Sequence, residues 1–201
     1  MNAHSEHTMD AQELRWIRRA KKRNHNAFEQ LVVKYQRQLY LAVRKIVLDH
    51  DDATDIVQES FVKAYQNLDR FDERYPFYPW LFRIGVNLSL NQQQKIRRQR
   101  ETFVRQDEEQ MRHIAAGQGT PLDQVLRTEL EEQIAGAMAE LPFEQRLVFL
   151  MKTSEEMSYQ EISESLDISP GTVMSRLSRA RSKLKELLQP YMTFFESEEK
   201  Q

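Results

Sequence analysis

The chain contains no cysteine, and only five glycines and six prolines among its 201 residues. The absence of cysteine excludes disulfides, cysteine nucleophiles and thiolate metal sites. So few glycines and prolines are not typical of a protein rich in β-turns. Apolar runs stay well short of the roughly 20 residues that a membrane span needs, and the first seven residues lack the charged-then-apolar pattern of a signal peptide. We therefore expect a soluble, cytoplasmic protein without membrane insertion.

The positions of the glycines and prolines indicate an all-α protein. Neither residue occurs from Asn24 to Tyr75, a stretch that only long helices use comfortably. Apolar residues in this stretch recur at steps of three and four, which places them on one face of a helix. Elsewhere glycine and proline punctuate the chain, and the helices are expected to break at 76–79, 117–121, 142, 170–171 and 190.

The pattern predicts two small helical domains joined by a flexible linker, the second a four-helix helix-turn-helix domain. The linker is inferred from its mixed charge and few large apolar residues. Pro79 is expected at the first position of the last helix in the first domain, and Thr120 is expected to cap the first helix of the second. The expected segments are an N-terminal tail and short helix at 1–23, the first domain at 24–100, the linker at 101–121, the second domain at 122–192 and a tail at 193–201.

The most specific local signal lies in the second domain. Ser158 and Glu161 have the spacing of a capping box, which predicts a helix that begins at Tyr159. Ser169 and Pro170 then supply an N-cap and a first helical position for another helix. Two helices across a turn of three to four residues are typical of a helix-turn-helix.

The second helix of this motif has separate apolar and polar faces. Residues 169–185 contain five basic side chains and no acidic one. Arginine can contact guanine edges, and short hydroxyls allow the backbone to approach phosphates. The alternative is a solvated basic face on an amphipathic helix, but the two caps and the turn length favour DNA recognition. The side chains expected to contact DNA are Thr172, Met174, Ser175, Arg176, Ser178, Arg179 and Lys183.

An aromatic loop in the first domain is the second candidate site. Six aromatic residues and three arginines lie between Arg70 and Arg83. Aromatic rings offer faces on which unpaired bases stack, and arginines hold the nucleic-acid backbone. The alternative is that rings such as those of Trp80 and Phe82 fill the domain core, and the sequence favours neither interpretation. A helix with amide and basic residues on its polar side follows the loop.

Acidic and amide side chains cluster on the first turns of the helix before this loop. Acids near a helix N-terminus complement the helix dipole, which is a sufficient structural explanation. An acidic, glutamine-bearing face also suits docking to a basic protein partner. The cluster consists of Asp51, Asp52, Asp55, Gln58 and Glu59.

Taken together, three segments resemble an extracytoplasmic-function (ECF) sigma factor of bacterial RNA polymerase. Residues 51–65 resemble the polymerase-binding helix of that family, 77–87 its promoter-melting segment, and 171–181 its upstream recognition helix. The resemblance covers about 24–100 and 125–190, in the order of the family. It implies a two-domain transcription initiation factor, active in a stress response, with no chemistry of its own.

The resemblance also implies partners and the residues that bind them. The polymerase core would be bound at its beta-prime clamp helices, through Asp55, Gln58 and Glu59, and at its beta flap. The recognition helix would read the minus-35 element of promoter DNA, and an anti-sigma protein is a further expected partner. Contacts with the minus-10 element are expected from Arg70, Phe71, Arg74, Tyr75, Phe77, Trp80, Arg83, Asn87, Asn91, Lys95, Arg97 and Arg98.

Two other classes of function compete with this interpretation. A stand-alone helix-turn-helix regulator, which would bind duplex DNA as a dimer, accounts for residues 157–188 but leaves the aromatic loop and the acidic helix unused. An enzyme is disfavoured because the five histidines are scattered and no metal, phosphate-loop or nucleophile motif is present. We therefore expect neither catalysis nor a cofactor or metal.

Overall fold

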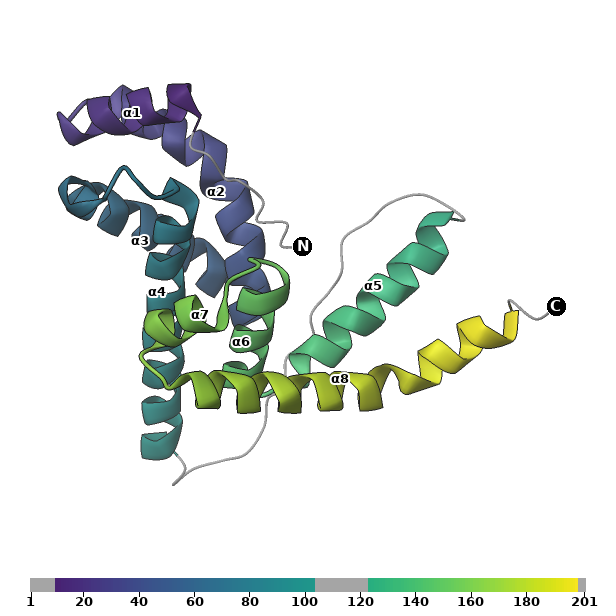
Figure 1. The fold of residues 1–201 in the computed structure, drawn as a ribbon. Coiled ribbons are helices and arrows are strands. Elements are labelled where there is room, and N and C mark those ends of the chain that lie inside the picture. The colour runs from purple at the N-terminus through teal and green to yellow at the C-terminus, as the bar shows by residue number, and fades with distance from the viewer. Residues whose placement is uncertain (1–9, 104–122, 199–201) are drawn as a thin grey trace. The chain divides into compact units, whose positions relative to one another are not determined.

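A computed structural model describes the backbone of residues 10–103 and 123–198, and the side chains of residues 10–99 and 131–191. The chain divides into two compact units, Met1–Glu109 and Gln110–Gln201, which we describe separately. The described parts of both units are built from helices joined by short connections (Figure 1). This confirms the all-α class and the two helical domains. None of the described helices is long and apolar enough to span a bilayer.

The first unit consists of four α-helices and a short 3-10 helix within the described residues. A polar side chain at Asp10, Asn24 and Asp49 caps each of the first three helices by accepting a hydrogen bond from a backbone N–H in the first turn. These caps explain why separate helices form in a stretch without proline or glycine. The elements are α1 (Ala11–Lys21), α2 (His25–Val47), α3 (His50–Asn67), η1 (Leu68–Arg70) and α4 (Phe77–Phe103).

The core of the first unit is arranged around α2, which contacts α1, α3 and α4. Leu31, Leu39 and Val43 of α2 are fully buried, as the spacing of three and four predicts. A glycine in α4 allows the closest packing. A Cβ at Gly85 would lie 3.3 Å from Leu39 Cδ1 and 3.4 Å from Ser60 Oγ of α3. The absence of a side chain at this position therefore lets α4 pack directly against both helices.

The second unit contains four helices within its described residues: α5 (Asp123–Ala139), α6 (Phe143–Thr153), α7 (Tyr159–Leu166) and α8 (Pro170–Glu198). The helix α8 contacts the other three. Its apolar residues Val173, Leu177 and Ala180 are buried, together with Ile162 of α7 and Met151 of α6. This arrangement confirms the predicted four-helix domain.

A buried arginine ties α6 to the end of α5. Arg146 donates hydrogen bonds to the backbone carbonyls of Met138, Ala139 and Leu141 at 3.4, 3.3 and 3.0 Å. These carbonyls belong to the last turn of α5 and its exit, where helix carbonyls lack the usual intrahelical donors. The Met138 carbonyl also accepts a hydrogen bond from the Leu141 N–H at 3.3 Å. Burial lowers the pKa of the Arg146 guanidinium to about 10. The free-energy cost of burying the guanidinium charge is offset because this side chain donates hydrogen bonds to three carbonyls.

The start of α4 differs from the sequence-based expectation. α4 begins at Phe77, so Pro79 occupies its third position and not its first. A proline is tolerated there because N–H groups of the first turn have no intrahelical acceptor. α4 also continues to Phe103, which lies inside the expected linker. The rest of that linker, with the expected Thr120 cap, lies outside the described residues.

The expected break at Pro190 was wrong. Pro190 lies inside α8, which continues to Glu198, beyond the expected domain end at 192. Proline removes only one backbone hydrogen bond of the helix, and α8 is 29 residues long. Proline can bend so long a helix without ending it.

Candidate nucleic-acid interface

The helix-turn-helix forms as the sequence predicts. The Glu161 backbone N–H donates to Ser158 Oγ at 3.2 Å, and the Ser158 N–H donates to Glu161 Oε2 at 2.7 Å, which completes the capping box. α7 ends at Leu166, and Asp167 follows in the left-handed region at φ 51°. The Thr172 N–H then donates to Ser169 Oγ at 3.1 Å, so Ser169 caps α8. The turn between the helices therefore spans only residues 167–169.

All seven residues expected to read the minus-35 element lie on α8 outside its buried stripe. Ser175, Ser178 and Arg179 lie opposite the stripe, and the other four lie to its sides. Met174, Ser175, Ser178 and Arg179 are exposed, and Thr172, Arg176 and Lys183 are half-buried. The Met174 side chain is unusual on such a polar face, because 56% of this large apolar residue is exposed. α8 thus presents hydroxyl, cationic and apolar groups on one surface, which is the mixture that major-groove readout uses.

Two hydroxyls on this surface already have local partners. Thr172 Oγ1 lies 2.9 Å from Ser169 Oγ, and Ser175 Oγ donates to the Thr172 carbonyl at 3.0 Å. Lys183 Nζ pairs with Glu186 Oε1 at 3.4 Å. The two hydroxyl groups therefore stabilise the first turns of α8. Because their side chains are short, they allow the helix to approach a groove closely.

The aromatic loop divides into buried and exposed rings. Phe71, Phe77, Tyr78 and Phe82 are buried, and Trp80 is half-buried. The Phe71 ring centroid lies 5.5 Å from that of Phe77 and 5.2 Å from that of Trp80. The core-filling interpretation therefore holds for most of the cluster.

This burial corrects the role that we expected of Phe71 and Phe77. Their rings fill the space between the loop and the core of the first unit, so neither offers a face to an unpaired base in this structure. Tyr75 is the ring that does, with 62% of the residue exposed. The sequence could not separate the two groups because aromatic residues are suited equally to stacking and to core packing.

The exposed part of the loop is held by an ion pair between neighbours. Both the backbone N–H and the Nε of Arg74 donate to Asp72 Oδ1 at 3.0 Å. These hydrogen bonds from Arg74 lower the pKa of the Asp72 carboxyl to about 2. The Arg74 guanidinium also lies 6.0 Å from the centre of the Tyr75 ring. Arg74 is thus oriented by Asp72 while its side chain stays largely exposed.

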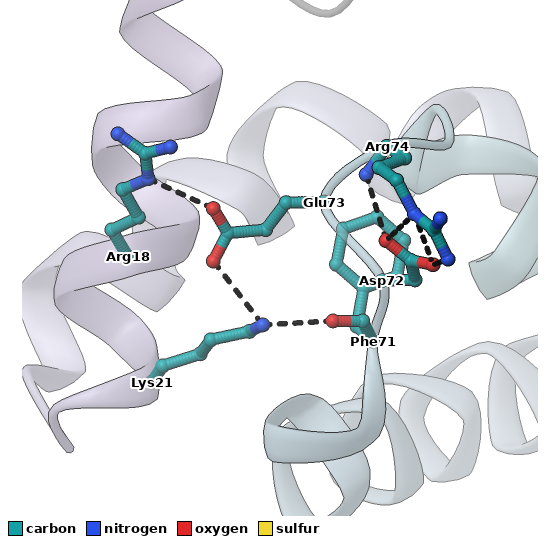
Figure 2. Close-up of polar contacts among 6 residues, drawn as sticks. All are labelled: Arg18, Lys21, Phe71, Asp72, Glu73 and Arg74. Carbon is teal, nitrogen blue, oxygen red and sulfur yellow. Dashed lines mark hydrogen bonds and ion pairs between the residues drawn. The ribbon is translucent and has the colours of Figure 1, made fainter.

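A second set of contacts joins the loop to α1. Arg18 Nε pairs with Glu73 Oε2 at 2.8 Å, and Lys21 Nζ pairs with Glu73 Oε1 at 3.2 Å. Lys21 Nζ also donates to the Phe71 carbonyl at 2.7 Å. Figure 2 shows the Glu73 carboxylate pointing toward Arg18 and Lys21, with the pair of Asp72 and Arg74 on the other side of the loop. Sequence reasoning missed these three residues because about 50 positions separate the partners and no local pattern marks them.

The polar face of α4 continues from this loop. Asn87, Asn91, Lys95 and Arg98 recur at steps of three and four, so they share one side of the helix. The remaining exposed residues expected to contact the minus-10 element are Arg70, Arg83 and Arg97. Cations and amides on one face suit binding to a phosphate backbone and to base edges.

The three residues expected to bind polymerase, Asp55, Gln58 and Glu59, are exposed on α3. Asp55 and Glu59 line a groove of about 390 Å³, and Asn91 and Lys95 line the same groove from α4. The expected polymerase-binding and DNA-binding surfaces therefore meet at this groove. The described residues contain no group of three or more histidine or acidic side chains arranged to hold a metal ion.

Comparison with family models gives two matches, one in each unit. The model for sigma-70 region 2 matches residues 31–102, which include α3, the aromatic loop and most of α4. The model for sigma-70 region 4 matches residues 131–184, which include the helix-turn-helix. α1 lies before the first matched region.

Similar proteins align over most of their length. The ECF RNA polymerase sigma-E factor of Haemophilus influenzae is 33% identical over 184 residues, which cover 88% of this chain and 95% of the relative. The ECF RNA polymerase sigma factor SigW of Bacillus subtilis is 32% identical over 179 residues, covering 86% and 94%.

Two solved structures share the fold. RpoE of Bartonella quintana, crystallised with the anti-sigma factor NepR, has a TM-score of 0.63 and 27% identity, and the match covers 81% of this chain and 96% of RpoE. CnrH, solved in complex with the cytosolic domain of CnrY, has a TM-score of 0.58 and 29% identity, covering 89% and 98%.

Proposed function

Since this chain belongs to the extracytoplasmic-function sigma factors, which direct bacterial RNA polymerase to promoters, we propose which of its surfaces perform each part of that task. The observation that carries the proposal is the exposed face of the first unit, which runs from Tyr75 along the polar side of α4. A stand-alone helix-turn-helix regulator would have no use for that face. A sigma factor needs it to hold single-stranded promoter DNA.

The first unit captures the minus-10 element. Tyr75 provides the face on which an unpaired base stacks, and Arg74 beside it contacts the adjacent phosphate. The amides and cations of α4, from Arg83 to Arg98, hold the strand that leaves the stacking site. Stacking one base on an aromatic ring contributes about 1–3 kcal/mol, which offsets the few kcal/mol needed to unstack that base from the duplex.

The second unit reads the minus-35 element through α8. Arg176 and Arg179 have the side chains that contact guanine edges, and Thr172 and Ser175 lie near the helix N-terminus, where α8 approaches the phosphates. Lys183, two turns further along, contacts the backbone of the groove. Met174 contributes apolar contact area in the same surface.

The acidic face of α3 docks the polymerase core. Asp55, Gln58 and Glu59 are exposed on one side of the helix and offer carboxylates and an amide to a basic partner surface. The beta-prime clamp helices bind there, and the beta flap binds the second unit. The protein itself supplies no catalytic chemistry or cofactor, and it acts in the cytoplasm, where the polymerase lies.

An anti-sigma protein inhibits the chain when no stress is present, by covering its polymerase-binding and DNA-binding surfaces. The complex of RpoE with NepR supports this proposal, because that sigma factor is 27% identical to this chain and was crystallised with its anti-sigma factor. The groove between α3 and α4 is the proposed contact, since occupying it would block the polymerase-binding acids and Lys95 together.

The test is transcription with purified components. The chain is mixed with bacterial core RNA polymerase and a genomic template, and transcript 5′ ends are mapped. We expect discrete starts that core polymerase alone does not give, with two shared upstream elements. Random starts, together with a chain that shifts duplex DNA without polymerase, would instead support the stand-alone regulator.

Variants then separate the three surfaces. Asp55→Lys is expected to weaken binding to the core without DNA. Tyr75→Ala is expected to weaken binding to a promoter with an open minus-10 element by roughly 5- to 150-fold. Arg179→Ala is expected to relax selection in the minus-35 element alone. Arg181→Ala is the matched control, because Arg181 is an exposed arginine on α8 outside the proposed surface.

A further inference from the structure

We propose that α1 positions the promoter-binding loop, and that Arg18, Lys21 and Glu73 form a clasp that keeps residues 72–76 in their DNA-binding shape. The inference rests on the proposed function, in which this loop contacts the minus-10 element. It assigns a role to a helix that lies before the region matched by the sigma-70 family model. Arg18 and Lys21 are positioning residues in this proposal and do not touch DNA.

The clasp acts at the middle of the loop. Each oxygen of the Glu73 carboxylate pairs with one cation of α1, Oε2 with Arg18 at 2.8 Å and Oε1 with Lys21 at 3.2 Å. Lys21 also donates to the Phe71 carbonyl at 2.7 Å, so it joins the backbone of Phe71 to the side chain of Glu73 (Figure 2). The buried rings of Phe71 and Phe77 fix the two ends. The clasp thus restrains the segment between two anchored ends.

The geometry leaves Arg74, one of the groups proposed to contact DNA, on the side away from α1. Figure 2 shows Glu73 directed toward α1 and Arg74 directed away from it. The Tyr75 N–H donates to the Asp72 carbonyl at 3.1 Å, which closes a turn over residues 72–75. Holding Glu73 on α1 therefore restrains the turn that carries Arg74 and the exposed Tyr75. Releasing Glu73 would let the loop rotate and would lower the fraction of time for which both groups face the strand.

The three charged side chains are expected to contribute unequally to the stability of the clasp. The side chains of Glu73 and Lys21 are only 28% and 23% exposed, whereas that of Arg18 is 63% exposed. Salt and water screen exposed pairs most strongly. The contact between Lys21 and Glu73 therefore carries more of the clasp than the shorter contact with Arg18. The hydrogen bond from Arg18 and the contacts of Lys21 lower the pKa of the Glu73 carboxyl, so the carboxylate is charged at neutral pH.

α1 is itself rigidly attached. Ile17 and Ala20 are fully buried against the rest of the unit, and Glu13 accepts hydrogen bonds from Lys34 and Tyr35 of α2, each at 2.6 Å. A helix fixed at this many points can hold a loop in place. This rigidity distinguishes the clasp from surface ion pairs between two mobile side chains, which contribute little.

The decisive variant is Glu73→Gln, because the clasp and simple electrostatics predict opposite results. Removing a negative charge near a DNA site strengthens general binding to phosphates. If Glu73 positions the loop, the same change must weaken binding. Asp69→Asn is the matched control. Asp69 pairs with Arg23 at 3.0 Å, between the end of α1 and η1, and does not touch residues 71–76.

The assay uses holoenzyme assembled from the full chain and bacterial core polymerase. The probe is a promoter fragment from the transcript mapping, with its minus-10 element left as single-stranded non-template DNA, and binding is followed by fluorescence anisotropy. Core binding without DNA and thermal unfolding are measured for every variant, so a folding defect is recognised directly. A fully duplex version of the fragment shows whether the open element matters for the wild-type chain.

We expect Glu73→Gln to weaken binding to the open fragment roughly three- to tenfold, the size expected for two partly buried ion pairs, while core binding is unchanged. Asp69→Asn is expected to leave binding equal or slightly tighter.

Binding by Glu73→Gln that equals or exceeds that of the wild type would overturn the clasp while leaving the proposed function intact. If the wild-type holoenzyme does not distinguish the open fragment from the duplex, the proposed minus-10 site fails first. The two failures are therefore distinguishable.

Discussion

Glu13 is the residue whose replacement tests most directly how α1 is held. Its side chain is only 5% exposed, and its two oxygens accept hydrogen bonds from Tyr35 Oη and Lys34 Nζ, both at 2.6 Å. Glu13→Gln keeps the size of the side chain and an acceptor for Tyr35. It removes the charge and turns an amide NH₂ toward the Lys34 ammonium, so that two donors face each other.

The expected loss follows from these contacts. A hydrogen bond to a charged group contributes about 1.5–3 kcal/mol. Lys34 is 35% exposed, so water partly replaces its lost partner and the cost falls toward the lower half of that range. We expect the free energy of unfolding of the first unit to fall by about 1.5–2 kcal/mol. For a domain of this size the melting temperature should fall by roughly 5–10 °C.

The assay is urea unfolding followed by tryptophan fluorescence. Both tryptophans, Trp16 in α1 and Trp80 in α4, belong to the first unit, so the signal does not report on the second. Glu29→Gln, at an exposed position on α2, is the matched control and should change stability by less than about 0.5 kcal/mol. A Glu13→Gln variant as stable as this control would refute the reasoning.

Three further predictions concern other parts of the chain. Burial and the hydrogen bond to Glu13 raise the pKa of Tyr35 far above its ordinary value. The unfolded chain therefore loses the phenolic proton near pH 10, whereas the folded chain keeps it. The free energy of unfolding consequently falls as the pH rises beyond about 10. Tyr35→Phe should flatten the fall in melting temperature between about pH 9 and 11, and parallel profiles would contradict this. Arg146→Met removes the side-chain donor from three backbone carbonyls of the second unit, of which Met138 keeps the Leu141 N–H. It should destabilise that unit by about 2 kcal/mol, measured by circular dichroism; an unchanged unfolding transition of the second unit would count against it. Met174 should contact thymine methyl groups. Replacing thymine by uracil in the selected minus-35 element should therefore weaken holoenzyme binding for the wild type but not for Met174→Ala. Equal losses for both proteins would exclude that contact.

Local signals in the sequence were sufficient for the helix-turn-helix. The capping box and the cap at Ser169 act within three residues of chain, so their hydrogen bonds depend on spacing alone. The buried stripe of α8 likewise follows from apolar steps of three and four. The assignment of Pro190 as a break failed because a proline removes only one backbone hydrogen bond, and α8 continues past it as a helix of 29 residues.

The candidate minus-10 site could be predicted only in part. Its aromatic and basic composition marked the segment, but composition does not show which rings are buried. That outcome depends on contacts with distant residues. Lys21, for example, lies 50 positions before Phe71, whose carbonyl it binds. Neither residue carries a local pattern that would pair it with the other.

The proposed function of the loop depends on the division of its aromatic residues into buried and exposed rings. A loop whose rings were all exposed would be mobile, and binding DNA would then require it to be ordered at a cost in conformational entropy. Burial of Phe71 and Phe77 removes most of that cost before DNA arrives. The ring of Tyr75 is left exposed, next to an arginine that Asp72 already orients. In the proposed function, the buried rings contribute to promoter binding by preorganising the residues proposed to contact DNA, and substitutions at Phe71 and at Tyr75 should weaken that binding for different reasons.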